Sequence, residues 1–199
     1  MSDRCMKIKD TRKENIFSAA LQCFIEKGYA ESSISMIASR AGISKGGLYH
    51  YFPTKRELFL GLFLYRVNQY SEQLRDQLHN EKSPDKRLKM LVREAGSLLV
   101  HNEAFYRFCL EFLSIGVRDA EIRSVMTDFY KETVGIFAHI VNEGIDTGLF
   151  QPIDSKKLAR MLYFTVMGAF FTFFSVDPDF TFSEQFSFQI NFMLKALQG

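Results

Sequence analysis

The 199-residue chain has little cysteine, and its cysteines show no arrangement that would hold a small fold together. Cys5, Cys23 and Cys109 are far apart in the sequence, and they form no CxxC pair. An odd number of scattered cysteines gives no recognisable disulfide framework, and it favours a reducing compartment. Cys109 lies in an apolar segment without an evident resolving partner, so an inert packing role is the first interpretation and thiol sensing the alternative.

Long uncharged runs are missing too. The longest one, residues 161–176, has sixteen residues, whereas a membrane-spanning helix needs about 18 or more apolar residues. Residues 1–10 are polar and no apolar segment of the signal-peptide kind comes after them. We therefore expect a cytoplasmic protein, associated with the nucleoid if it binds DNA, with no signal peptide and no membrane partner.

Motifs that carry catalysis are also absent. The sequence contains no HExxH, GxSxG, P-loop or GxGxxG motif, and its four histidines are scattered. His101 and Glu103 are close in sequence, but a helix would direct them apart. These absences predict a protein that is not an enzyme and that needs neither a cofactor nor a metal ion.

Neither sign of charge dominates the whole chain, whose net charge is +2, yet the charges are unevenly distributed. Residues 1–56 hold ten basic and five acidic side chains, whereas residues 57–199 hold fifteen and eighteen. A basic end on an acidic remainder is typical of a protein whose one end meets phosphate. Chance variation in solvated charge would give the same asymmetry, so charge alone does not decide the function.

What the sequence does contain is helical periodicity, with no repeat and no sustained strand-like alternation. Apolar residues at helical spacing and short breaks predict an all-α fold of nine helices. The helices are expected at about 11–27, after Ser33, after Ser44, and at 54–79, 84–100, 104–115, 119–147, 155–175 and 182–197. The first helices are expected to form a small head, residues 1–53, and the others a body, residues 54–199.

Two short helices near the N-terminus have clear boundaries. Ser33 and Ser44 are good N-caps, and Gly28 is a natural residue to end the first helix. Gly42 breaks the chain between the two short helices, and Ile43 would fill the corner. Short helices joined by a tight glycine-containing turn are a helix-turn-helix.

The segment Gly42–Lys55, GISKGGLYHYFPTK, closely resembles the recognition segment of the TetR/AcrR family of transcriptional regulators. The resemblance covers about residues 11–60, and the remainder matches only in its helix pattern. It implies that residues 1–53 are a helix-turn-helix domain that binds double-stranded DNA with two half-sites. It also implies that residues 54–199 bind an effector and form a dimer. By this resemblance the DNA contacts are Ser33, Ser35, Lys45, Gly46, Gly47, Tyr49, His50 and Lys55.

Physical chemistry gives most of these residues a role. A recognition helix enters the major groove by its N-terminal end, where Gly46 and Gly47 let the backbone approach closely. Lys45 extends a cation that suits a guanine, and Leu48 should anchor the helix inward. Tyr51 and Phe52 suit the core, and Lys55 should grip the DNA backbone. Lys7, Lys9 and Arg12 form either a basic arm along the minor groove or a solvated segment.

The body is rich in phenylalanine: sixteen of the 21 lie beyond residue 100. Such side chains suit a pocket for a small apolar or amphipathic effector, although the same spacing is equally that of plain core. The candidate lining residues are Phe105, Phe108, Cys109, Phe112, Phe129, Tyr130, Phe137, Tyr163, Phe164, Met167 and Phe171.

The last two helices are the candidate dimer interface. One stripe of residues 155–175 begins at Leu158 and Leu162, and a second comprises Met161, Phe164, Met167, Gly168, Phe171 and Phe174. Two apolar stripes on one helix predict burial on two sides, against the body and against a partner. In the last helix Phe186, Ile190, Met193 and Leu197 continue this pattern of burial.

The resemblance implies a repressor that a ligand releases from its operator. The long helix at 54–79 would act as the lever between head and body, with His101, Arg107 and Glu111 near that joint. The alternative is a DNA-binding architectural or division-related protein of the same fold without a small-molecule effector.

Overall fold

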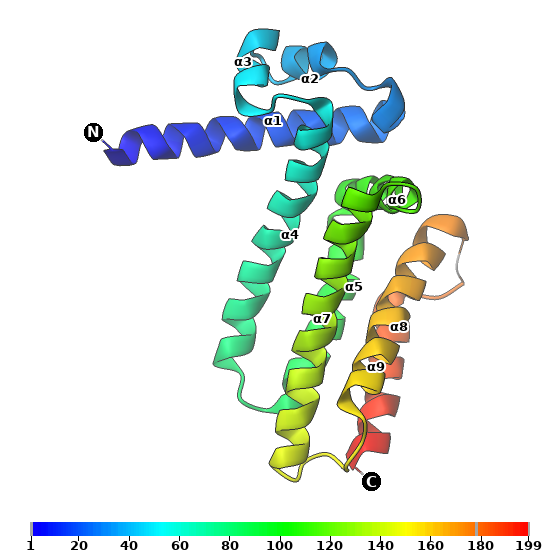
Figure 1. Ribbon diagram of the computed structural model, residues 1–199. Coiled ribbons are helices and arrows are strands. Elements are labelled where there is room, and N and C mark those ends of the chain that lie inside the picture. Colours follow the sequence, from blue (N-terminus) through cyan, green and yellow to red (C-terminus); the bar gives the residue numbers. More distant parts are fainter. Residues whose placement is uncertain (1, 178, 199) are drawn as a thin grey trace. The chain divides into compact units, whose positions relative to one another are not determined.

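A computed structural model describes residues 2–177 and 179–198 of the chain, and the side chains of residues 2–10 and 98–100 are not described. Within the described ranges the fold is all-α, as predicted (Figure 1). Its nine helices are α1 (Ser2–Glu31), α2 (Ile34–Arg40), α3 (Lys45–Tyr51), α4 (Lys55–Asn80), α5 (Pro84–His101), α6 (Glu103–Gly116), α7 (Ala120–Asp146), α8 (Ser155–Ser175) and α9 (Phe182–Gln198).

Most helix boundaries have a local cause. The side chains of Ser33, Ser44 and Asp154 each accept a hydrogen bond from a backbone N–H in the first turn of the next helix, which is N-capping. Helix α1 is the exception, because it starts at Ser2 and not near Thr11 as expected. The prediction relied on the apolar stripe, but residues 2–10 contain no glycine or proline that would end a helix. The side chains of Lys7 and Lys9 lie outside the described residues.

The chain forms two compact units, residues 1–70 with 104–122 and residues 71–103 with 123–199. Helix α6 therefore belongs to the unit that contains the helix-turn-helix. Helices α4 and α7 each have residues in both units. The predicted boundary between a DNA-binding domain and a body at residue 53 is a functional division, and it remains a prediction.

An aromatic core holds the first unit together. Phe59 of α4 contacts Phe24 of α1 at a ring-centroid distance of 5.1 Å. It also contacts Phe108 and Phe112 of α6 at 4.9 and 5.2 Å. All four rings are almost completely buried, and burial of each ring stabilises the fold by about 1.5–3 kcal/mol. These contacts fix α6 against α1 and α4.

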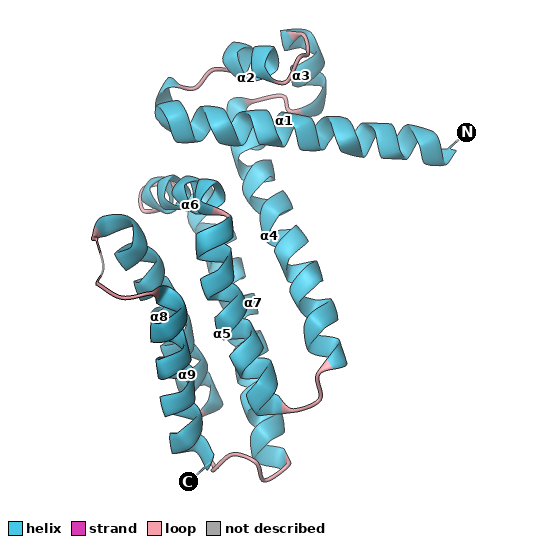
Figure 2. Cartoon of the chain, turned by 180° about the vertical axis from the view of Figure 1, so that it is seen from behind, coloured by secondary structure: helices cyan, strands magenta, loops and turns pink. Residues whose placement is uncertain are grey.

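The second unit is a bundle in which α8 and α9 lie beside α5 (Figure 2). The approach of α9 to α5 is close: a Cβ added at Gly96 would lie 2.8 Å from the ring of Phe186. Phe186, Ile190, Met193 and Leu197 are all buried inside this chain. These four side chains form the side of α9 that packs inside the chain, and a partner contact of the last two helices remains a prediction.

The outward face of α8 is apolar and largely uncovered. Phe164 and Phe171 are 61% and 50% exposed, and Phe188 and Phe192 of α9 are 66% and 69% exposed. By length and composition α8 would also suffice to span a membrane, and only about a fifth of its most apolar stretch is buried inside the chain. A single such helix is weak evidence for a membrane span. The exposed rings of α8 and α9 thus form an apolar surface that no other part of the described chain covers.

Candidate nucleic-acid interface

Helices α2 and α3 lie side by side next to α1 and form a helix-turn-helix (Figure 1). Gly42 turns the chain between them with a φ of 66°, a left-handed conformation that favours glycine. The N–H of Ile43 then bonds to the carbonyl of Ala38, which closes the turn. Ser44 caps α3 by accepting from the N–H of Gly47 at 3.0 Å.

Helix α3 has one buried anchor and an exposed face. Leu48 is completely buried, as predicted, and it orients the helix. Lys45, Gly46, Tyr49 and His50 are exposed, and Gly47 is half-exposed. The Lys45 ammonium lies 5.9 Å from the ring of Tyr49. This face presents a cation, two ring groups and an open backbone.

Two further predicted contacts, Ser33 and Ser35, are exposed at the start of α2. The Ser33 hydroxyl accepts a hydrogen bond from the N–H of Met36 at 3.2 Å. Its capping role is therefore visible, and its contact with phosphate remains a prediction. Of the two aromatic residues expected in the core, Phe52 is buried and Tyr51 is half-buried.

Lys55 has a role inside the protein that the sequence does not reveal. Its ammonium donates hydrogen bonds to the carbonyls of Tyr29, Ala30 and Ser32, at 2.6, 3.2 and 2.9 Å. It also lies 4.4 Å from the ring centre of Tyr29. Partial burial lowers the pKa of Lys55 from its ordinary value. Because an ammonium has three N–H donors, these carbonyls suffice to engage it, and its contact with DNA phosphate stays a prediction.

Glu111 of α6 contacts the same turn that Lys55 binds, residues 28–32 at the end of α1. One carboxylate oxygen accepts a hydrogen bond from the backbone N–H of Tyr29. It lies over Gly28, which has a φ of 76° and breaks the helix geometry of α1. Glu111 thus contacts the segment that precedes α2, and its expected place at the joint between head and body remains a prediction.

Replacing Gly28 with Ala should lower the free energy of unfolding by about 1–2 kcal/mol, since a Cβ disfavours the left-handed conformation. The new Cβ would also lie 3.2 Å from the Glu111 carboxylate oxygen. Urea denaturation followed by circular dichroism measures the change. Gly135→Ala is the matched control, because Gly135 lies in α7 with nothing within 4 Å of the added Cβ. Equal stability of Gly28→Ala and the wild type would contradict the prediction.

Arg56 links the start of α4 to the start of α7. Its guanidinium binds both carboxylate oxygens of Asp119 at 2.6 and 2.7 Å. It also donates to a carboxylate oxygen of Glu121 at 2.8 and 2.9 Å. The hydrogen bonds from Arg56 are the main reason that the pKa of Asp119 lies well below its ordinary value. The sequence contained a signal for this contact. Lys55 and Arg56 lie in the first turn of α4, where cations are unfavourable near the positive end of the helix dipole, so acidic partners are expected.

The predicted effector residues are divided between the two compact units. Phe105, Phe108 and Phe112 are buried against other rings of the first unit. The prediction that they line a pocket is not supported by this close packing. Burial raises the pKa of Cys109 in the same helix, which disfavours the reactive thiolate.

The other predicted effector residues belong to the second unit. Phe137 is buried in the core, while Phe164 and Phe171 face outward. The half-buried residues are Phe129, Tyr130, Tyr163 and Met167. Tyr130 of α7 and Tyr163 of α8 meet edge to face at 5.0 Å. These half-buried side chains of α7 and α8 remain the candidates for lining an effector-binding site.

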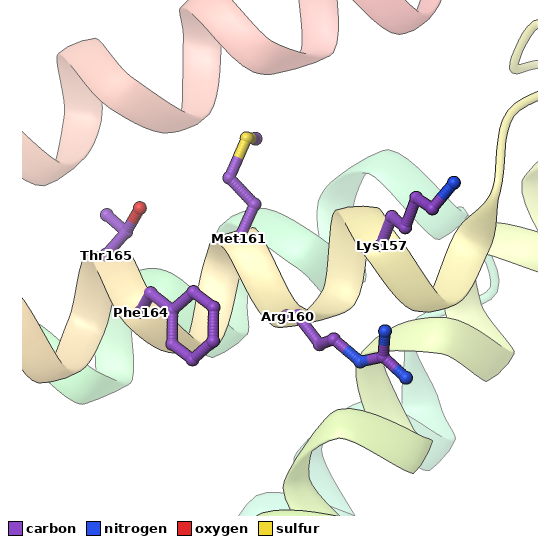
Figure 3. Close-up of a pocket in the computed structure, with 5 residues that line it drawn as sticks. All are labelled: Lys157, Arg160, Met161, Phe164 and Thr165. Atoms are coloured by element: carbon purple, nitrogen blue, oxygen red, sulfur yellow. The ribbon is translucent and has the colours of Figure 1, made fainter.

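An open pocket of about 540 Å³ lies on α8 and has an apolar and a cationic part (Figure 3). All its lining residues come from α8: Lys157, Arg160, Met161, Phe164 and Thr165. Only Phe164 was among the predicted effector residues. In the part of the chain that the structure describes, no group of three or more His, Cys, Asp or Glu side chains is placed to hold a metal ion.

Comparison with known proteins identifies two family profiles along the chain. Residues 16–62 match the bacterial regulatory proteins of the tetR family, and residues 84–185 match the C-terminal part of BetI-type transcriptional repressors. The fatty acid metabolism regulator protein of Bacillus subtilis is 28% identical over 161 residues, which is 80% of this chain and 81% of that protein. The nucleoid occlusion factor SlmA of Aliivibrio fischeri is 24% identical over 90% of this chain and 92% of its own.

Solved structures give the same result for the fold. The regulator FadR from Bacillus subtilis, in complex with stearoyl-CoA, superimposes with a TM-score of 0.80 at 22% identity. The match covers 92% of this chain and 98% of FadR. Regulators of this family bind operator DNA, act as dimers and are not enzymes. Together with the capped helix-turn-helix, these matches establish that the chain belongs to the TetR family of transcriptional regulators.

Proposed function

We propose that the protein is a cytoplasmic, nucleoid-associated homodimeric repressor that a long-chain acyl thioester releases from its operator. The observation that carries the DNA-binding part is the exposed face of α3, held in place by the buried Leu48. Ser33, Ser35 and the exposed α3 residues are the proposed DNA contacts. The acyl thioester is favoured because the relative from Bacillus subtilis is a fatty acid metabolism regulator and FadR was solved with stearoyl-CoA.

The proposed dimer interface is the exposed apolar face of α8 and α9. Met161, Phe164 and Phe171 on α8 are exposed, as are Phe188 and Phe192 on α9. An apolar surface of this kind is typical of a protein–protein contact. A two-fold dimer would present two copies of α3 to two half-sites, about 34–36 Å apart in successive major grooves.

Release results from a shift between two states of the dimer. In one state the separation of the two α3 helices fits DNA, and in the other it does not. A ligand that prefers the second state lowers DNA affinity by its differential affinity for the two states. We propose that the effector lies against the half-buried side chains of α7 and α8, with Tyr130 and Tyr163 among them.

The testing experiment is a fluorescence-anisotropy titration of the protein against DNA flanking its own gene, at one stated salt concentration. Stearoyl-CoA, shorter acyl-CoAs and free coenzyme A are then added separately. We expect binding to the DNA and its loss with the long-chain thioesters but not with free coenzyme A. Binding that no acyl-CoA weakens would instead favour the alternative, a DNA-binding protein without an effector, as the likeness to SlmA suggests.

Replacing Lys45 with Ala should lower affinity for the operator by about 5- to 150-fold, which corresponds to the 1–3 kcal/mol of a good base contact. Lys45 lies in the first turn of α3 and is exposed. Its loss should weaken binding to unrelated DNA less, so sequence preference relaxes. Competition titrations with operator and unrelated DNA measure both effects. An equal loss on both DNAs would assign Lys45 to phosphate alone.

A further inference from the structure

The end of α1 and the link to α2, residues 28–32, form a turn that is held by side chains from two other helices. Lys55 of α4 donates to three of its carbonyls, and Glu111 of α6 accepts from the N–H of Tyr29. The turn also binds itself, since the Ser32 hydroxyl donates to the carbonyls of Gly28 and Cys23 at 2.7 and 3.0 Å. Helix α2 begins only two residues after Ser32, so whatever fixes this turn also fixes the start of the helix-turn-helix.

A second contact, between Arg56 of α4 and Asp119, involves the residue next to Lys55. Lys55 holds the turn, and the next residue, Arg56, binds Asp119 immediately before α7. Asp119 also accepts from the N–H groups of Glu121 and Ile122 and thereby caps α7. Glu111 and Asp119 lie in or just after α6 and both belong to the first unit. Carboxylates near the two ends of one short segment thus hold the start of α4 and the end of α1.

We propose that Glu111 and Asp119 act as positioning residues for DNA binding. Through the contacts Glu111–Tyr29 and Asp119–Arg56, here called the α6 clasp, they fix the helix-turn-helix on α6. The clasp makes the orientation of the helix-turn-helix depend on α6. The inference rests on the proposed function only where it concerns DNA binding.

The geometry favours a clasp over a passive contact. The Glu111 oxygen approaches the backbone of α1 directly over Gly28, where a Cβ would lie 3.2 Å away. The aromatic rings of Phe108 and Phe112 alone would hold α6 by shape, which tolerates small sliding. Hydrogen bonds between a carboxylate and a single N–H, or between a carboxylate and a guanidinium, are directional and are lost when α6 moves.

Hydrogen–deuterium exchange on the full-length, ligand-free protein tests the positioning role without any assumption about DNA or effector. In Glu111→Ala we expect exchange to become about fivefold faster, or more, across residues 29–52. Glu111→Gln keeps an acceptor oxygen and should restore most of the protection. Asp128→Asn removes an exposed carboxylate of α7, which pairs with Lys131 at 3.9 Å, and should change nothing. Faster exchange confined to the amide of Tyr29 would overturn the proposal.

Discussion

Replacing Phe188 and Phe192 together with Asp should convert the protein into a monomer and lower its affinity for operator DNA at least about 100-fold. The two rings stack on each other at 6.2 Å on the surface of α9, and both are about two-thirds exposed. In the proposed dimer they are covered by a partner, and a buried unpaired carboxylate there costs several kcal/mol. A monomer loses DNA affinity because its second head is no longer tethered to the first.

Analytical ultracentrifugation measures the oligomeric state, and anisotropy measures DNA binding with the same samples. Leu64→Asp is the matched control, since Leu64 is an exposed apolar residue on α4. The double variant should retain its helical content, because neither ring belongs to the buried core of the second unit. A double variant that remains dimeric would place the interface elsewhere.

Replacing Lys55 with Ala should lower the free energy of unfolding by about 2–4 kcal/mol. The ammonium binds three carbonyls of one turn, hydrogen bonds of charged groups contribute about 1.5–3 kcal/mol each, and the effects of neighbours overlap. DNA binding should weaken as well, because the start of α2 depends on this turn. The dependence of DNA affinity on salt decides between this role and a phosphate contact.

A residue that contacts phosphate contributes about 0.9 to the slope of log affinity against log salt concentration. We expect Lys55→Ala to keep the wild-type slope and to lose stability in urea denaturation. Lys45→Ala is the matched comparison and should keep the wild-type stability, because Lys45 is exposed. A slope reduced by about one in a stable Lys55→Ala protein would restore the role that the sequence assigned to it.

The helix-turn-helix could be predicted from the sequence because its determinants are local. Ser33, Ser44 and Gly42 act on backbone groups within a few residues, so their pattern is readable without knowing the fold. The capping contacts of Thr54 with Glu57 and of Thr181 with Glu184 were readable for the same reason. The inward direction of Leu48 also follows from helical spacing alone.

The remaining features depend on contacts between residues far apart in the chain. Glu111 and Tyr29 are separated by 82 positions, and no periodicity relates them. Helix α9 is apolar on more than one side, so the sequence could not tell whether Phe186 or Phe188 would face the core. The spacing of Phe105, Phe108 and Phe112 is the same for a cavity wall and for a packed core. Which of the two they form is decided by the rings of α1 and α4.

The assignment of α6 to the first unit has a consequence for recombination between relatives. A hybrid made by a single crossover after residue 53 would join a foreign head to the native α6. Phe24 would then come from one parent while Phe108, which it contacts at 6.0 Å, came from the other. Glu111 would likewise face a foreign turn. A hybrid that keeps a native core has to inherit residues 1–70 and 104–122 from the same parent, so the inheritable module is discontinuous along the gene.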